Sequence, residues 1–293
     1  TQGVNELTAA TRPDGRLVIG ATVMQSYLHT DGDLGDYRLV DATDPRQPQP
    51  LSDWDQRRKM SPESQGETDA VPTDYHIHSS RFSADGMMAW LAAWDGGVVA
   101  LDLAVVGDPV VAAVLPAGPT TAGNVHSVAI DPSARLLIRS DEDLNPIAAD
   151  GEAPGWGGQT LYDISDVGRV EPLGEFRSPN AGDEELVPSY SGFFSAHEAE
   201  IADGIEYVAA YSDGLRIVDI AEPEDPVEIG SFVPPPALDK HGHWKAYDGT
   251  PAFPLVWGVE VVDELIYLSD VNTGLWIVRL STPDGDVSGV GVL

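Results

Sequence analysis

The sequence predicts an all-β protein, a β-propeller with five four-stranded blades. Three observations favour this fold: one motif recurs five times, the apolar segments have strand length and are separated by turn residues, and no convincing amphipathic helix occurs. Each copy of the motif is a short apolar run ending at an anchor position, and the anchors lie 56 to 61 residues apart, at positions 41, 102, 163, 219 and 279. Regular repetition of four short strands is typical of propeller blades.

The strands of one repeat can be read from its turn residues. In the fourth repeat, apolar segments at 199–202, 206–210, 214–219 and 227–232 are separated by Asp213-Gly214 and Asp225-Pro226. Gly tolerates the positive φ of hairpin turns, and Pro suits the looser connection before a fourth strand. We expect the Asp residues at the anchor positions 41, 102, 163 and 219 to cap turns through their neighbouring backbone amides.

These repeats predict a single domain over residues 1–293. The expected blades span residues 5–55, 76–116, 124–177, 195–233 and 256–293. A sixth blade is the alternative, assembled from irregular stretches at 55–75, 141–157 or 178–194.

The motif also resembles a known repeat. Its clearest copy reads Leu215-Arg-Ile-Val-Asp219-Ile and is followed by Pro223 to Pro226, whereas Leu275-Trp-Ile-Val-Arg279 lacks the Asp and Leu161-Tyr-Asp163 is weaker. These copies resemble the LVIVD-repeat family, and the resemblance covers nearly the whole chain. It implies a secreted or surface-anchored propeller, and it says little about chemistry because the activity of most members is unassigned.

The net charge of the chain disfavours some classes of binding partner. Lys and Arg number 16 against 48 Asp and Glu, giving a net charge of −32 among 293 residues. Such a surface repels phosphate backbones, so nucleic acid is not an expected partner. The acidic excess fits two settings equally, a halophilic protein screened by salt or a secreted protein from a GC-rich genome. Calcium binding by clustered Asp ranks lower because no EF-hand-like spacing occurs.

The cysteine content and the hydropathy of the chain exclude further kinds of site and location. The chain has no cysteine, which excludes disulfides, thiolate metal sites and cysteine nucleophiles. No apolar run is long enough to span a bilayer, so no membrane insertion is expected. The first residues lack a basic region followed by an apolar run, so any secretion signal is absent or already removed. We expect an extracellular or periplasmic location, and the oligomeric state stays open.

Three of the seven histidines hold equivalent repeat positions. His78, His126 and His197 each begin a first strand, four residues before Phe82, Ile130 and Ile201. First strands line the central channel of a propeller, so these imidazoles are expected to converge. Convergent imidazoles suit one transition metal ion such as Zn, Cu, Fe or Mn, with His241 as a fourth ligand. The alternative is that each histidine only hydrogen-bonds to the backbone between blades.

Five residues near this position are candidates for catalysis. His241 and His243 lie in the loop that leads into the fifth repeat, and the others, three residues after the His or Trp position, are Arg81, Glu200 and Glu260. A carboxylate beside a metal site can act as general base. A structural layer of ion pairs in the channel is an equally good interpretation of the same residues.

Aromatic residues suggest a pocket near the same end of the fold. Tyr75, Phe194 and Trp244 lie in long loops between repeats, and Trp257 holds the histidine position of the fifth repeat. Long ordered loops often carry function. We expect a pocket for a small molecule or saccharide, with capping of the channel as the alternative.

Two functions follow from these observations. The first is a secreted metal-dependent enzyme, an oxidoreductase or a lyase or hydrolase, acting on a small molecule. The second is a non-catalytic extracellular binding module in which the histidines are structural. An intracellular interaction scaffold fits poorly, since the charge repels acidic partners.

Overall fold

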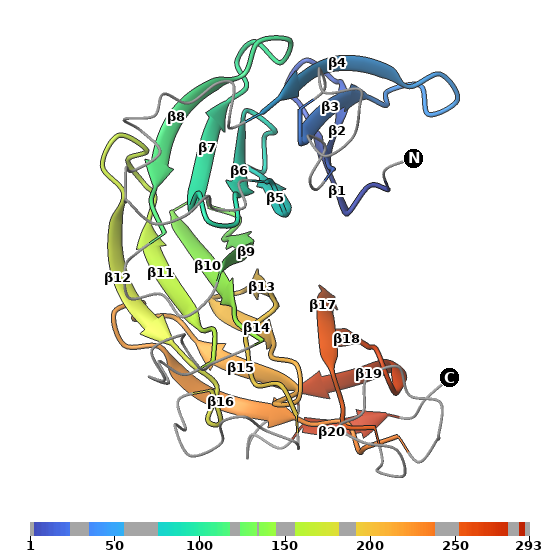
Figure 1. Ribbon diagram of the computed structural model, residues 1–293, viewed down its shortest axis with the longest axis vertical. Helices are drawn as coiled ribbons and strands as arrows, with labels where there is room; N and C mark the ends of the chain where they lie inside the picture. Colours follow the sequence, from blue (N-terminus) through green and yellow to red (C-terminus); the bar gives the residue numbers. More distant parts are fainter. Residues whose placement is uncertain are drawn as a thin grey trace. The chain divides into compact units, whose positions relative to one another are not determined.

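Five antiparallel sheets of four strands make up the computed structural model (Figure 1). The structure describes residues 3–23, 35–55, 76–117, 124–133, 135–144, 156–181, 192–237, 252–280 and 287–290. Each sheet is built from four consecutive strands paired with their chain neighbours, as expected for blades.

The first two blades follow each other along the chain. The strands of the first blade are β1 (Glu6–Thr11), β2 (Leu17–Thr22), β3 (Tyr37–Asp41) and β4 (Gln49–Trp54). The strands of the second are β5 (Ser79–Phe82), β6 (Met88–Ala92), β7 (Val98–Asp102) and β8 (Val110–Leu115).

The remaining three blades repeat this order. The third contains β9 (Asn124–Ile130), β10 (Leu136–Glu142), β11 (Gln159–Asp163) and β12 (Glu171–Phe176). The fourth contains β13 (Glu198–Ala202), β14 (Ile205–Ala209), β15 (Leu215–Asp219) and β16 (Val227–Phe232). The fifth contains β17 (Val256–Val262), β18 (Leu265–Asp270), β19 (Gly274–Leu280) and β20 (Val287–Val290).

The predicted five-bladed, all-β architecture is confirmed, down to local detail of the repeat. A register shift interrupts the pairing of the third and fourth strands at Leu39/Val40, Ala100/Leu101 and Ile217/Val218, which are equivalent places in blades one, two and four. Such bulges re-aim side chains and increase local twist. Sheet geometry is thus repeated together with the sequence motif.

The anchor aspartates cap turns, as predicted. The side chains of Asp41, Asp102, Asp163 and Asp219 each accept a hydrogen bond from the backbone amide two residues further on, at 2.7–2.9 Å. This contact holds the chain as it leaves each third strand. The fifth anchor carries Arg279, so blade five lacks this cap.

The chain divides into two compact units, and the division passes through the third blade. One unit contains residues 1–120, 124–139 and 162–171, and the other contains residues 121–123, 140–161 and 172–293. In the first unit, blades one and two share a core that includes Tyr37, Trp54 and Leu101, while Trp90 of β6 packs with Val128 and Leu137 of the third blade. Apolar burial of this kind is the main stabilising contribution to such a fold.

The second unit has its own core. Tyr207, Ile217 and Val256 belong to the apolar cluster between blades four and five. A smaller cluster contains Trp156, Ala181 and Phe194. Among the residues that the structure describes, no helix is long and apolar enough to cross a membrane.

Candidate metal centre

The three repeat histidines lie at the starts of first strands, as the spacing predicts. The amide of His78 donates to the carbonyl of Ala92 at 2.8 Å, and the amide of His197 donates to Ala209 at 2.9 Å. His126 lies within β9. His126 and His197 are 2% and 1% exposed, so protein surrounds both imidazoles almost completely.

In the first unit, three imidazoles gather around one indole. The ring centroids of His78 and His126 are 3.9 Å apart, and Trp94 stacks on His76 at 5.0 Å and on His78 at 5.2 Å. Burial lowers the pKa of His78 to about 4, and the neighbouring His76 adds to this effect. His78 is therefore neutral at neutral pH, which is the form of imidazole that binds metals.

In the second unit, His197 lies among a carboxylate and two aromatic rings. Its ring centroid is 5.1 Å from that of Tyr211 and 4.6 Å from that of Trp257. The hydroxyl of Tyr211 donates a hydrogen bond to a carboxylate oxygen of Glu142. A carboxylate oxygen of Glu142 and a ring nitrogen of His197 lie within 4.8 Å of each other.

Glu142 was not singled out from the sequence, although the repeat contains a signal for it. The amides of Ala93, Asp141 and Ala210 donate to Gly97, Gly158 and Gly214, each at 2.8 Å, so these three residues are equivalent in blades two, three and four. The next residues along the chain are Trp94, Glu142 and Tyr211. A carboxylate therefore stands in blade three where blades two and four carry an aromatic ring.

Backbone conformation marks the same repeat position. Trp94 and Tyr211 have φ of 47° and 44°, in the left-handed region that bulky side chains rarely adopt. Both are tied to the next first strand: the carbonyl of Trp94 accepts from Val125 at 3.1 Å, and Tyr211 exchanges two hydrogen bonds with Val256. Strained residues of this kind cluster at functional sites, where the surrounding structure keeps them in place.

The electrostatics of Glu142 and Tyr211 follow from their burial. Burial raises the pKa of Glu142 above its usual value, and the hydrogen bond from Tyr211 opposes that rise. Burial and the adjacent Glu142 charge raise the pKa of Tyr211. The tyrosine therefore keeps its proton and donates a hydrogen bond to the carboxylate of Glu142.

The predicted catalytic residues lie in different settings. Arg81 forms an ion pair with Glu6 of β1 in the first unit. Glu200 accepts a hydrogen bond from the amide of Val261 at 2.6 Å. Glu260 is exposed on β17. His241 and His243 lie outside the described residues.

The predicted aromatic pocket is only partly described. Phe194 is buried and packs edge-on against Trp156, with centroids 5.7 Å apart. Trp257 is 39% exposed, so part of its ring is free to contact a ligand beside His197. Tyr75 and Trp244 lie outside the described residues.

Comparison with known proteins bears on the fold. Two solved structures similar to the chain are a hypothetical selenium-binding protein from Sulfolobus tokodaii and the periplasmic gluconolactonase of Pseudomonas aeruginosa. The first is 17% identical with a TM-score of 0.59, over 99% of this chain and 66% of that one. The second is 16% identical with a TM-score of 0.59, over 97% of this chain and 70% of that one.

The fold is a β-propeller. At these identities the likeness shows the fold alone, and the chain spans just under two thirds of the length of the selenium-binding protein. No protein-family model matches the chain, and no curated protein matches it. Function therefore has to be argued from the residues themselves.

Proposed function

We propose that the protein is a metal-dependent enzyme acting on a small molecule, with one divalent transition-metal ion bound by His126, Glu142 and His197. The observation that carries the proposal is the proximity of the Glu142 carboxylate to the His197 imidazole. His126 is proposed as the third ligand because it holds the repeat position equivalent to that of His197 in the sequence. Glu142 thus takes the place that the sequence alone suggested for His78.

The donor set supports this choice. Two imidazoles and one carboxylate are suitable ligands for Zn, Fe, Mn or Ni, and three protein ligands leave further coordination positions for substrate. A metal ion at such a site supplies Lewis-acid chemistry by polarising an oxygen of the substrate.

The chain's own residues have separate roles in this proposal. Tyr211 orients Glu142 through its hydroxyl, as residues around metal ligands commonly do. Trp257 provides a partly exposed ring next to His197, on which the apolar face of a flat molecule or a sugar ring can stack. A small organic or saccharide substrate fits this arrangement better than a macromolecule.

Elemental analysis by plasma mass spectrometry tests the proposal. Untagged protein, stripped and then reconstituted with Zn, Mn or Fe, is expected to retain about one ion per chain after dialysis. Separate His126→Ala, Glu142→Ala and His197→Ala variants are expected to lose it, whereas His78→Gln keeps it.

The outcomes distinguish the alternatives. Metal loss in His78→Gln but not in Glu142→Ala would favour a ligand set made only of histidines. No retained metal in the folded, reconstituted protein would overturn the metal-enzyme proposal and favour the non-catalytic binding module. Circular dichroism of each variant separates loss of metal from loss of fold.

A further inference from the structure

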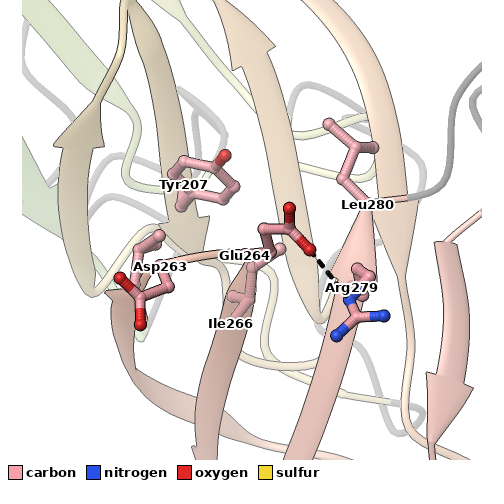
Figure 2. Close-up of a pocket in the computed structure, with 7 residues that line it drawn as sticks. Tyr207, Asp263, Glu264, Ile266, Arg279 and Leu280 are labelled. Carbon is pink, nitrogen blue, oxygen red and sulfur yellow. Dashed lines mark ion pairs between the residues drawn. The ribbon is translucent and has the colours of Figure 1, made fainter.

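A surface pocket between blades four and five carries charges that the repeat does not predict (Figure 2). Its volume is about 400 Å³, within the range of ligand pockets. Its lining residues come from β14, from the β17–β18 hairpin and from β19: Tyr207, Val261, Asp263, Glu264, Ile266, Arg279 and Leu280. All of them belong to the second unit.

The pocket has an apolar part and a charged part. Val261, Ile266 and Leu280 belong to the apolar packing between the two blades, and Tyr207 adds an aromatic ring. In Figure 2, Glu264 lies between Asp263 and Arg279, and its carboxylate pairs with the guanidinium of Arg279 at 3.8 Å. An amphipathic molecule is the kind of ligand that such a lining accommodates.

Two of these charged residues depart from the repeat. Arg279 stands at the anchor position where the other four blades carry Asp, and Glu264 follows Asp263 where blade four carries Gly204 after Asp203. The turn of the fifth blade keeps φ of 55° at Asp263, so its backbone resembles that of Asp203, with φ of 52°. The hairpin of blade five therefore has the same backbone conformation as that of blade four and differs from it in its side chains.

Negative charge exceeds positive charge around the pocket. Among the described residues that line the pocket, Arg279 is the only cation, and Glu264 already pairs with it. Asp263 makes no hydrogen bond or ion pair through its side chain with the described part of the chain. Burial raises the pKa of Tyr207, and the nearby charges of Asp203 and Glu200 raise it further, which places two more carboxylates close to the ring.

We propose that this pocket binds an organic ammonium ion with an apolar body. The ammonium group pairs with Asp263, whose carboxylate has no partner among the described residues, and lies near the ring of Tyr207, which attracts cations through its π face. The apolar body covers Val261, Ile266 and Leu280. This site is separate from the proposed metal centre, and its occupancy does not depend on a bound metal.

Ligand-observed NMR with phenethylammonium tests the proposal, using phenethyl alcohol as a neutral probe of similar shape. The titration is done in about 1 M KCl, where a Debye length of about 3 Å suppresses general attraction to the acidic surface. A ligand of this size on an open pocket is expected to bind with a dissociation constant of about 1 mM. Phenethyl alcohol is expected to bind more weakly.

Matched variants are expected to change the affinity for phenethylammonium in opposite directions. Asp263→Asn removes the charge and keeps a residue that tolerates positive φ, so binding should weaken about three- to fivefold. Tyr207→Leu should weaken it by a similar factor, about three- to fivefold. Arg279→Gln frees Glu264 and removes a repelling cation, so binding should tighten about twofold. Asp225→Asn, at an exposed turn of blade four, is the charge control and should change nothing.

The proposal is overturned if phenethylammonium shows no saturable binding, or if the neutral alcohol binds equally well. It is also overturned if Asp263→Asn binds like the unmodified protein, or if Arg279→Gln fails to tighten binding. His126→Ala should leave the titration unchanged, so failure of the metal proposal and failure of this one are distinguishable.

Discussion

Replacing Glu206 with glutamine is expected to stabilise the protein at alkaline pH and to leave it nearly unchanged at mildly acidic pH. Glu206 lies on β14 and is 0% exposed. Neither of its carboxylate oxygens has a hydrogen-bond partner of good geometry among the described residues. Burial raises its pKa to about 8, and the nearby Gln159 amide offsets only part of that rise.

The magnitude follows from linkage. The pKa of Glu206 is about 8 in the folded state and 4.5 for an ordinary Glu. Between these two pH values, the folded state therefore keeps a proton on Glu206 that the unfolded state has already released. Stability from this group is therefore present below about pH 4.5 and is lost as the pH rises towards 8. At about 1.4 kcal/mol per pKa unit, the loss between about pH 5 and about pH 8.5 reaches about 4 kcal/mol.

Glutamine mimics the protonated carboxyl and does not titrate. Urea unfolding of the unmodified protein and of Glu206→Gln is measured at about pH 5 and about pH 8.5 by tryptophan fluorescence. The variant should have the higher free energy of unfolding, and its advantage over the unmodified protein should be about 4 kcal/mol larger at the higher pH than at the lower one. Glu222→Gln, at an exposed turn, controls for loss of one negative charge. Equal differences at both pH values would refute the reasoning.

Two further predictions concern the metal centre and the hairpin turns. Tyr211→Phe removes the hydrogen bond to Glu142, so metal affinity measured by competition with a chelator should fall about 10- to 100-fold, and unchanged affinity would exclude an orienting role for the hydroxyl. Gly214→Ala should lower the free energy of unfolding by more than about 3 kcal/mol, since its Cβ would lie 2.3 Å from the carbonyl of Phe232 at a φ of +74°. Gly274→Ala is the matched control, because its Cβ would meet nothing within 4 Å at a φ of +90°, and it should cost about 1–2 kcal/mol. Similar losses in both glycine variants would contradict the steric argument.

The blade architecture could be predicted because its determinants are local. Strand-length apolar runs, hairpin glycines such as Gly214 and turn-capping aspartates such as Asp219 recur with the period of the fold, and each acts on its immediate neighbours. The equivalence of His78, His126 and His197 followed from the same period.

The candidate site was only partly predictable. Glu142 was missed because its importance depends on contacts with His197 and Tyr211, which are 55 and 69 positions away along the chain. The left-handed backbone of Trp94 and Tyr211 could not be predicted for a different reason. Bulky residues rarely adopt this conformation, and no turn motif in the sequence indicates it. The LVIVD resemblance, the secreted location and the absence of nucleic-acid partners stay predictions.

Anomalous X-ray diffraction from crystals of the metal-loaded protein, recorded at the absorption edge of the bound metal, tests the central claim most directly. The account predicts one strong peak per chain, with ring nitrogens of His126 and His197 and a carboxylate oxygen of Glu142 about 2.0–2.2 Å away. A peak bound by other residues, or no peak in crystals of protein reconstituted with Zn, Mn or Fe, would contradict it.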